Sequence, residues 1–121
     1  MKLRFRENSL RLRVNRREVD ALTSGIALAE QLHFPENSIS YVLELSKEPS
    51  PQASFREGTI RVSAPRDLVH QWAENESIGM YFELPANGAT LKIAIEKDLE
   101  CIDGPPEERD PEAFPRSSRN C

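Results

Sequence analysis

The chain has few of the residues that cross-link small proteins or bind metals. Its 121 residues include two cysteines, Cys101 and Cys121, and two histidines, His33 and His70. Both cysteines lie at or beyond the end of the patterned region, so we expect free thiols in a reducing compartment and no disulfide framework. Neither histidine has another ligand-type side chain at the usual metal-binding spacing, so we predict no metal site and no cofactor.

Long apolar runs are also missing. The longest apolar stretches have the length of a strand, so none could span a bilayer. The opening MKLRFREN alternates apolar with basic residues, unlike the continuous apolar core of a secretion signal. We therefore expect a cytoplasmic protein with no membrane partner. With 38% apolar and 30% charged residues, the composition is that of a globular domain.

Motifs for catalysis are absent as well. The sequence has no glycine-rich phosphate loop, no His-Glu-x-x-His motif, no dinucleotide fingerprint and no serine or cysteine within a nucleophile motif. The acids Glu96, Asp98 and Glu100 near Cys101 lack the glycine and the ligand order of a calcium loop. We therefore expect that the protein is not an enzyme and has no catalytic residues.

The sequence does contain an internal repeat with a period of fifty residues. FRENSLRLRVNRREV at residues 5–19 aligns without a gap with FREGTIRVSAPRDLV at residues 55–69. The identical pairs are Phe5/Phe55, Arg6/Arg56, Glu7/Glu57, Arg11/Arg61, Arg16/Arg66, Val19/Val69, Pro35/Pro85 and Asn37/Asn87. Two copies are too few for a solenoid or a propeller, so the repeat predicts two similar halves related by a pseudo-twofold axis.

Both halves have the same expected order of elements. Around residues 2–6 and 10–14, apolar residues alternate with basic ones, which predicts a half-buried hairpin. Asn15 and Glu18 form a capping box for a helix over residues 16–24, which Gly25 ends. Strands follow at about 26–34 and 39–45, although Glu30 breaks the apolar pattern of the first of these. The second half repeats this order with strands at about 53–56, 59–64, 77–84 and 89–97, a helix opened by Pro65 and a turn at Asn87-Gly88.

These elements predict a β-rich α+β fold. Four short strands cannot cover both of their faces alone, so we expect two tandem β-β-α-β-β repeats to form one pseudo-twofold small barrel or sandwich. The expected single domain spans residues 1–97, with repeats at 1–46 and 53–97 and a connector at 47–52. Residues 98–121 are acidic and rich in proline, which predicts a disordered tail with Phe114 as its one large apolar anchor.

Charge is unevenly distributed along the chain. The formal net charge is −4, yet residues 1–25 carry seven Lys/Arg and three acids, whereas residues 98–121 carry three and seven. Strand alternation should place a cluster of arginines on one outward face, with equivalents in the second half: Arg4, Arg6, Arg11 and Arg13, then Arg56 and Arg61. Such a face can contact phosphates and base edges and is the candidate nucleic-acid-binding site. A solvated face paired with acids across strands, or a docking place for the acidic tail, explains the same pattern.

A resemblance to a known family starts from the run Asn8 to Asn15, followed by a short helix and two strands. The run resembles the W-G-N-S-x-x-V-R-I-P opening of MazE-type antitoxin regulators, which belong to the AbrB-like swapped-hairpin group of DNA binders. Asn8-Ser9 match its Asn-Ser and Leu12-Arg13-Val14 its Val-Arg-Ile, whereas Arg6-Glu7 replace Trp-Gly. In that family two units interleave their hairpins into one barrel, and the basic hairpin face lies on DNA. The resemblance implies that this chain supplies both units.

The whole chain also resembles a group of short, uncharacterised bacterial proteins. The matching segments are Leu91 to Cys101 and Asp110 to Pro115. The combined expectation is a non-enzymatic bacterial module that acts as a DNA-binding or antitoxin-like regulator. In an antitoxin-like protein, the acidic tail would wrap a protein partner with Phe114 as its buried anchor. The alternative is a protein-interaction or accessory module without nucleic-acid binding, whose tail and sheet edges bind a partner. A third alternative is a small enzyme whose phosphorylated substrate is held by the same arginines.

Overall fold

The computed structural model of the protein describes residues 1–99 and 111–115. Within them, the elements follow the order β-β-α-β-β twice. They are β1 (Lys2–Arg6), β2 (Ser9–Val14), α1 (Arg16–Thr23), β3 (Leu28–His33), β4 (Ser38–Ser46), β5 (Gln52–Arg56), β6 (Thr59–Pro65), α2 (Arg66–Glu74), β7 (Gly79–Ala86) and β8 (Ala89–Lys97). The predicted β-rich α+β fold with two tandem repeats is thus confirmed. No helix in the described part of the chain has the length and apolarity that crossing a membrane requires.

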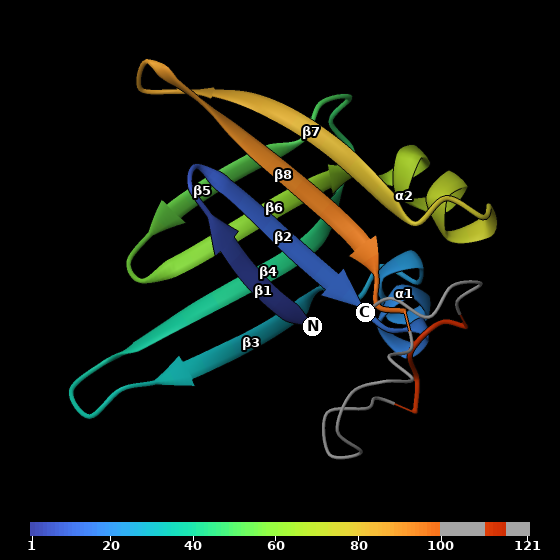
Figure 1. The fold of residues 1–121 in the computed structure, drawn as a ribbon, viewed down its shortest axis with the longest axis horizontal. Helices are drawn as coiled ribbons and strands as arrows, with labels where there is room; N and C mark the ends of the chain where they lie inside the picture. The colour runs from blue at the N-terminus through green and yellow to red at the C-terminus, as the bar shows by residue number, and fades with distance from the viewer. Residues whose placement is uncertain (100–110, 116–121) are drawn as a thin grey trace. The chain divides into compact units, whose positions relative to one another are not determined.

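Each of the two sheets combines one hairpin from each repeat. The strand order is β1-β2-β8-β7 in one sheet and β3-β4-β6-β5 in the other (Figure 1). The hairpins join through parallel pairs, β2 with β8 and β4 with β6, whereas every pair within a hairpin is antiparallel. Within residues 1–99 and 111–115, both sheets keep two open edges, and neither closes into a barrel.

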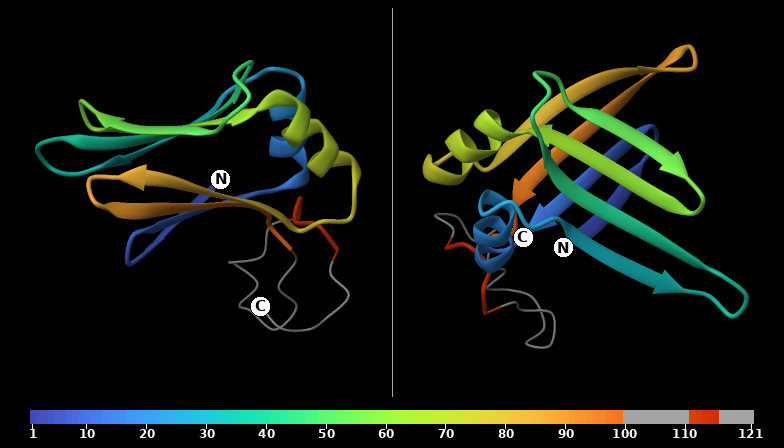
Figure 2. Two further views of the ribbon diagram at one scale, coloured as in Figure 1. Left: turned by 90° about the horizontal axis from the view of Figure 1, so that it is seen from above. Right: turned by 180° about the vertical axis from the view of Figure 1, so that it is seen from behind.

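The chain forms two compact units that do not coincide with the repeats. The first unit consists of Met1–Val19 and the described part of Ser77–Cys121, and the second of Asp20–Glu76. Sheet β1-β2-β8-β7 belongs to the first unit and sheet β3-β4-β6-β5 to the second (Figure 2). Neither repeat is therefore a compact unit by itself.

The first unit buries one face of its sheet. Alternation in β2 turns every second side chain inward, and the parallel register sets Leu10 beside Ile93 and Leu12 beside Ile95. The buried apolar side chains of this face are Leu10, Leu12, Val14, Met80, Ile93 and Ile95. Each such side chain contributes about 1.5 to 3 kcal/mol when it is removed from water. The same alternation leaves the basic residues of β1 and β2 on the opposite face.

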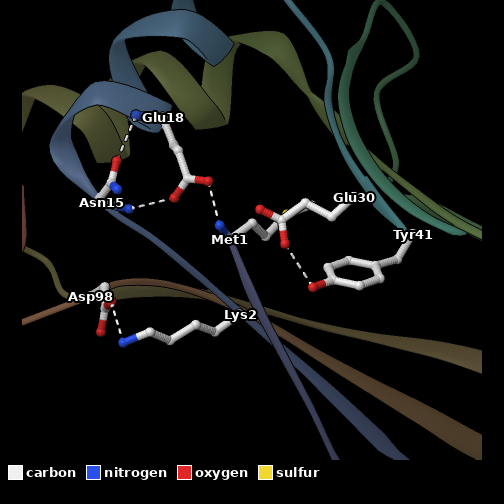
Figure 3. Close-up of polar contacts among 7 residues, drawn as sticks. All are labelled: Met1, Lys2, Asn15, Glu18, Glu30, Tyr41 and Asp98. Carbon is white, nitrogen blue, oxygen red and sulfur yellow. Dashed lines mark hydrogen bonds and ion pairs between the residues drawn. The ribbon is translucent and has the colours of Figure 1, made fainter. Parts of the chain in front are cut away.

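Helix α1 begins with the predicted capping box. The backbone N–H of Glu18 donates to Asn15 Oδ1 at 2.9 Å, and the N–H of Asn15 donates to Glu18 Oε1 at 3.0 Å (Figure 3). These two bonds satisfy donors that the first helical turn would otherwise leave open. The other carboxylate oxygen of Glu18 accepts from the backbone amine of Met1. The helix ends before Gly25, which has φ 89° and donates its N–H to the carbonyl of Leu22.

In the second unit, α2 packs against the sheet. Val69 and Trp72 of α2 are buried, and the helix contacts β4 and β6. The core of its sheet includes Val42, Leu43, Val62 and Ala64. Glu30, which broke the apolar pattern, lies directly across from Tyr41, whose hydroxyl donates to Glu30 Oε2 at 2.8 Å (Figure 3). Glu30 is exposed, as are Leu32 and most of β3, so the strand accommodates an acid at this position without burying its charge.

The parallel pairs of the two sheets differ in register by two residues. Leu10 pairs with Ile93 in the first sheet. The equivalent residues, fifty positions away, are Ile60 and Leu43, but Ile60 pairs with Tyr41. A slip of one residue would exchange the two faces of a strand, whereas a slip of two preserves them. The hairpin loops differ as well, with four residues between β3 and β4 and two between β7 and β8. Positive φ at Asn87 and Gly88 gives the predicted tight turn.

Part of the expected tail is seated on the first unit. Phe114 forms a β-bridge with Leu99 and donates its N–H to the carbonyl of Asp98 at 2.7 Å. Arg16 donates its N–H to the carbonyl of Glu112 at 2.9 Å, and Ala113 is buried. Figure 2 shows this segment, in red, beside the start of α1. Residues 111–115 thus contact the first unit, whereas residues 100–110 and 116–121 of the predicted tail, with Cys101 and Cys121, lie outside the described residues, and disorder of the tail stays a prediction.

Candidate functional site

The outward face of sheet β1-β2-β8-β7 collects basic side chains. The antiparallel register of β1 and β2 sets Arg4 beside Arg11 and Arg6 beside Ser9. Because Cβ directions alternate along each strand, the side chains that share this face are Lys2, Arg4, Arg6, Arg11, Arg13 and Lys92, with the acids Glu83 and Glu96. Four of the six predicted arginines are thereby brought together. We call this surface the basic face.

The basic face is hollowed, with a cavity volume of about 500 Å³. The strand registers place Arg4, Arg11, Ala94 and Tyr81 in one row across the four strands. Ala94 has a small side chain between long ones, so it forms a floor and its neighbours form walls. The hollow is lined by Arg4, Arg6, Ser9, Leu10, Arg11, Tyr81, Phe82, Glu83, Lys92, Ile93 and Ala94.

Glu96 forms ion pairs with two of the predicted arginines. Its Oε1 lies 3.2 Å from Arg11 Nε and 3.5 Å from Arg13 Nε, and its Oε2 accepts from the Tyr81 hydroxyl at 2.8 Å. The Glu96 side chain is 12% exposed, so these partners replace most of its contact with water. This arrangement matches the alternative in which arginines meet acids across strands, but only for Arg11 and Arg13.

The other four cations of the basic face do not contact Glu96. Lys2 Nζ lies 2.8 Å from Asp98 Oδ2 (Figure 3). Arg4, Arg6 and Lys92 form no ion pair with residues 1–99 or 111–115. All three line the hollow, so their charges are available to an anionic ligand.

Tyr81 is an exposed aromatic ring in the wall of the hollow. The residue is 64% exposed although its hydroxyl is bonded to Glu96. A Cβ atom at Gly79 would lie 2.7 Å from the Tyr81 hydroxyl oxygen, so the hydroxyl end of the ring occupies the space beside Gly79 that a side chain would fill. Partial burial raises the pKa of Tyr81, as do the hydrogen bond to Glu96 and the charge of that carboxylate, against an opposing effect of Arg11.

Sequence reasoning missed both Tyr81 and Lys92. The signal was present, because Met80, Phe82 and Leu84 alternate with Tyr81 and predict that Tyr81 points outward. Connecting it with the arginines required the pairing of β8 with β2, which places β7 and β8 beside the first hairpin.

The remaining predicted arginines belong to the second unit. Arg56 lies on β5, and Arg61 lies on β6, where its guanidinium forms an ion pair with Glu44. Their neighbours on the same strands include Ser54 and Ser63, where the first repeat has Arg4 and Arg13. The equivalent face of the second unit is therefore less basic.

Phe114, the predicted partner anchor, contacts the protein's own chain. Its ring centroid lies 5.6 Å from Lys97 Nζ, within the range of a cation–π interaction. The neighbouring Glu112 carboxylate lies 3.5 Å from Arg17. No residue of 111–115 lines the hollow, so this described piece of the tail docks near Arg17 and not on Arg4 or Arg6.

Comparison with known proteins places the chain in a family. No curated protein and no solved structure matches it. A model of a protein family does match residues 1–118, a span that includes both repeats, the basic face and Phe114. The chain therefore belongs to this family, which is described as a family of unknown function (DUF7009).

Proposed function

We propose that the protein is a non-enzymatic cytoplasmic regulator whose basic face binds the phosphate backbone of DNA. The observation that carries this proposal is the convergence of Arg4, Arg6 and Lys92, none of them ion-paired within the described residues, on one hollow. Guanidinium groups match phosphate oxygens with paired donors, and lysine adds a point charge.

The AbrB/MazE-like resemblance supports DNA as the ligand. Each sheet combines a hairpin from either repeat, as interleaved hairpins require. In the family that the sequence resembles, the DNA-binding surface is the basic hairpin, and here the corresponding hairpin is β1-β2. An antitoxin-like regulator is the role that follows from this likeness.

The net charge of −4 does not prevent the basic face from binding phosphate groups. Six cations share the basic face with Glu83 and Glu96, and Asp98 lies at its margin. Charges farther away than about 8 to 10 Å are largely screened at physiological ionic strength. A bound phosphate therefore responds mainly to the local excess of positive charge.

Salt dependence of DNA binding tests the proposal. With three cations that form no ion pair within residues 1–99 and 111–115, the plot of log affinity against log salt for a duplex of about 20 base pairs should have a slope of about −3 between about 50 and 200 mM salt. The Arg4→Ala/Arg6→Ala variant should reduce the magnitude of that slope by about two. Arg56→Ala on the second unit is the matched control and should leave the slope unchanged. Absence of duplex binding at about 50 mM salt would overturn the proposal.

A second candidate is a protein-interaction module. Phe5 and Phe55 occupy equivalent positions on the edge strands β1 and β5 and are 61% and 67% exposed. An open strand edge with an exposed aromatic ring can accept a strand from a partner. Chemical crosslinking of the wild type should then recover protein partners. The Phe5→Ser/Phe55→Ser variant should lose these partners, whereas the Arg4→Ala/Arg6→Ala variant should retain them.

A further inference from the structure

The position of Tyr81 is not explained by binding of a phosphate backbone alone. A phosphate site needs donors and positive charge, which Arg4, Arg6 and Lys92 supply. An exposed aromatic ring adds neither, yet Tyr81 also lines the hollow. A ring beside cations is suited to a ligand that carries both flat bases and phosphates.

The ring is also held in place before any ligand binds. The Tyr81 hydroxyl donates to Glu96 Oε2, and Glu96 is fixed in turn by Arg11 and Arg13. Gly79 leaves the space that the hydroxyl end of the ring occupies. A ring that is already ordered loses little conformational freedom when a flat ligand stacks on it.

The spacing across the sheet leaves room for such a ligand. Neighbouring strands lie about 4.8 Å apart, so Tyr81 and Arg11, on either side of Ala94, are separated by roughly 10 Å at the backbone. The Ala94 methyl group does not fill this space, and the hollow opens above it. Arginine can itself stack on a base, which gives the ligand a second flat neighbour.

We propose, on the basis of the function proposed above, that the hollow binds single-stranded nucleic acid. One base stacks on the exposed ring of Tyr81, and neighbouring phosphates are bound by Arg4, Arg6 and Lys92. The faces of bases in a duplex are covered by their neighbours, whereas a single strand can present an unstacked base to an aromatic ring. The basic face therefore favours a single strand over a duplex at equal salt.

The competing explanation is that Tyr81 only covers an edge glycine. An aromatic ring that crosses Gly79 stabilises an edge strand without any ligand. The two explanations differ in what happens when the ring is removed. A covering role affects the stability of the sheet, whereas stacking affects the affinity for bases and leaves the affinity for phosphates unchanged.

The experiment measures binding by the full-length chain to three probes at one salt concentration. They are a labelled oligothymidylate of about 12 nucleotides, a duplex of the same length, and inorganic polyphosphate as a competitor. The wild type should bind the single strand more tightly than the duplex. Tyr81→Leu should weaken oligothymidylate binding by roughly fivefold to a hundredfold and leave competition by polyphosphate unchanged. Tyr81→Phe, which retains the ring, should restore most of the loss.

A control variant and the circular dichroism spectrum of each variant complete the design. Phe55→Leu removes an equally exposed ring from the second unit and should not change binding to any probe. Equal binding of oligothymidylate by Tyr81→Leu and wild type would overturn the stacking proposal, and duplex binding would then still support the proposed function. Equal losses for oligothymidylate and polyphosphate would also overturn it, since the ring would act through Glu96 and Arg11. No binding to either nucleic acid would overturn both proposals.

Discussion

Replacing Glu96 with glutamine should weaken the fold and strengthen nucleic-acid binding at the same time. The carboxylate accepts a hydrogen bond from Tyr81 and forms ion pairs with Arg11 and Arg13, so it stabilises the sheet while it engages two cations of the basic face. Glutamine has nearly the same shape and no charge. The substitution therefore removes the electrostatic part of these contacts and releases both guanidinium groups.

Both effects have a calculable size. A hydrogen bond to a charged acceptor exceeds a neutral one by about 1 kcal/mol, and each partly exposed ion pair adds about 0.2 to 1 kcal/mol. The free energy of unfolding should thus fall by about 2 kcal/mol. Two released cations should steepen the salt dependence of single-strand binding by about 1.4 in the log–log slope.

Urea unfolding and fluorescence anisotropy between about 50 and 200 mM salt measure the two effects. Glu44→Gln is the matched control, because it removes the same charge and releases Arg61 on the second unit. That variant should not change the slope. An unchanged slope for Glu96→Gln, or the same change for Glu44→Gln, would refute the reasoning, since only overall charge would then matter.

Two further predictions concern the core and Tyr81. Leu12 is 1% exposed and lies beside Ile95, so Leu12→Ala should lower the free energy of unfolding by about 3 kcal/mol in urea, and a loss below about 1 kcal/mol would contradict this packing. The raised pKa of Tyr81 means that the folded protein keeps the phenol proton at a pH where the unfolded chain has lost it, so stability should fall as the pH rises above about 10. A pH titration followed by tyrosinate absorbance should show a step above the ordinary pKa of tyrosine, and Tyr81→Phe should remove this step. Gly79→Ala should lower the pKa of Tyr81 toward its ordinary value, because the alanine Cβ displaces the Tyr81 hydroxyl from Glu96.

Local features were predictable from the sequence because they depend on neighbours along the chain. The capping box of Asn15 and Glu18 is a contact across three residues, and the Asn87-Gly88 turn depends on two residues that adopt positive φ. Alternation along β2 placed Arg11 and Arg13 on one face without any knowledge of the neighbouring strands. The arginine part of the candidate site follows from this alternation alone.

Long-range pairing was not predictable in the same way. The contact of Leu10 with Ile93 joins strands more than eighty positions apart, and apolar strands of similar length offer no local signal that selects this partner. The two-residue difference in register between the sheets keeps every side chain on its face, so the hydrophobic pattern cannot distinguish the two registers. The ion pair between Arg11 and Glu96 depends on that pairing and was therefore missed.

The contacts of the segment around Phe114 could not be predicted from composition. Backbone hydrogen bonds to Asp98 and Arg16, burial of Ala113 and the Lys97–Phe114 contact supply specific interactions that an average over an acidic, proline-rich stretch ignores. Phe114→Ala should therefore lower the free energy of unfolding by about 1 to 2 kcal/mol, since the ring is half-buried and a fully buried one is worth about 3 to 5 kcal/mol. Nucleic-acid affinity should stay the same, because no residue of 111–115 lines the hollow. Thermal unfolding and anisotropy on the same samples test both statements: an unchanged melting temperature would show that the docked segment does not stabilise the first unit, and a stronger binding would show that it covers the basic face.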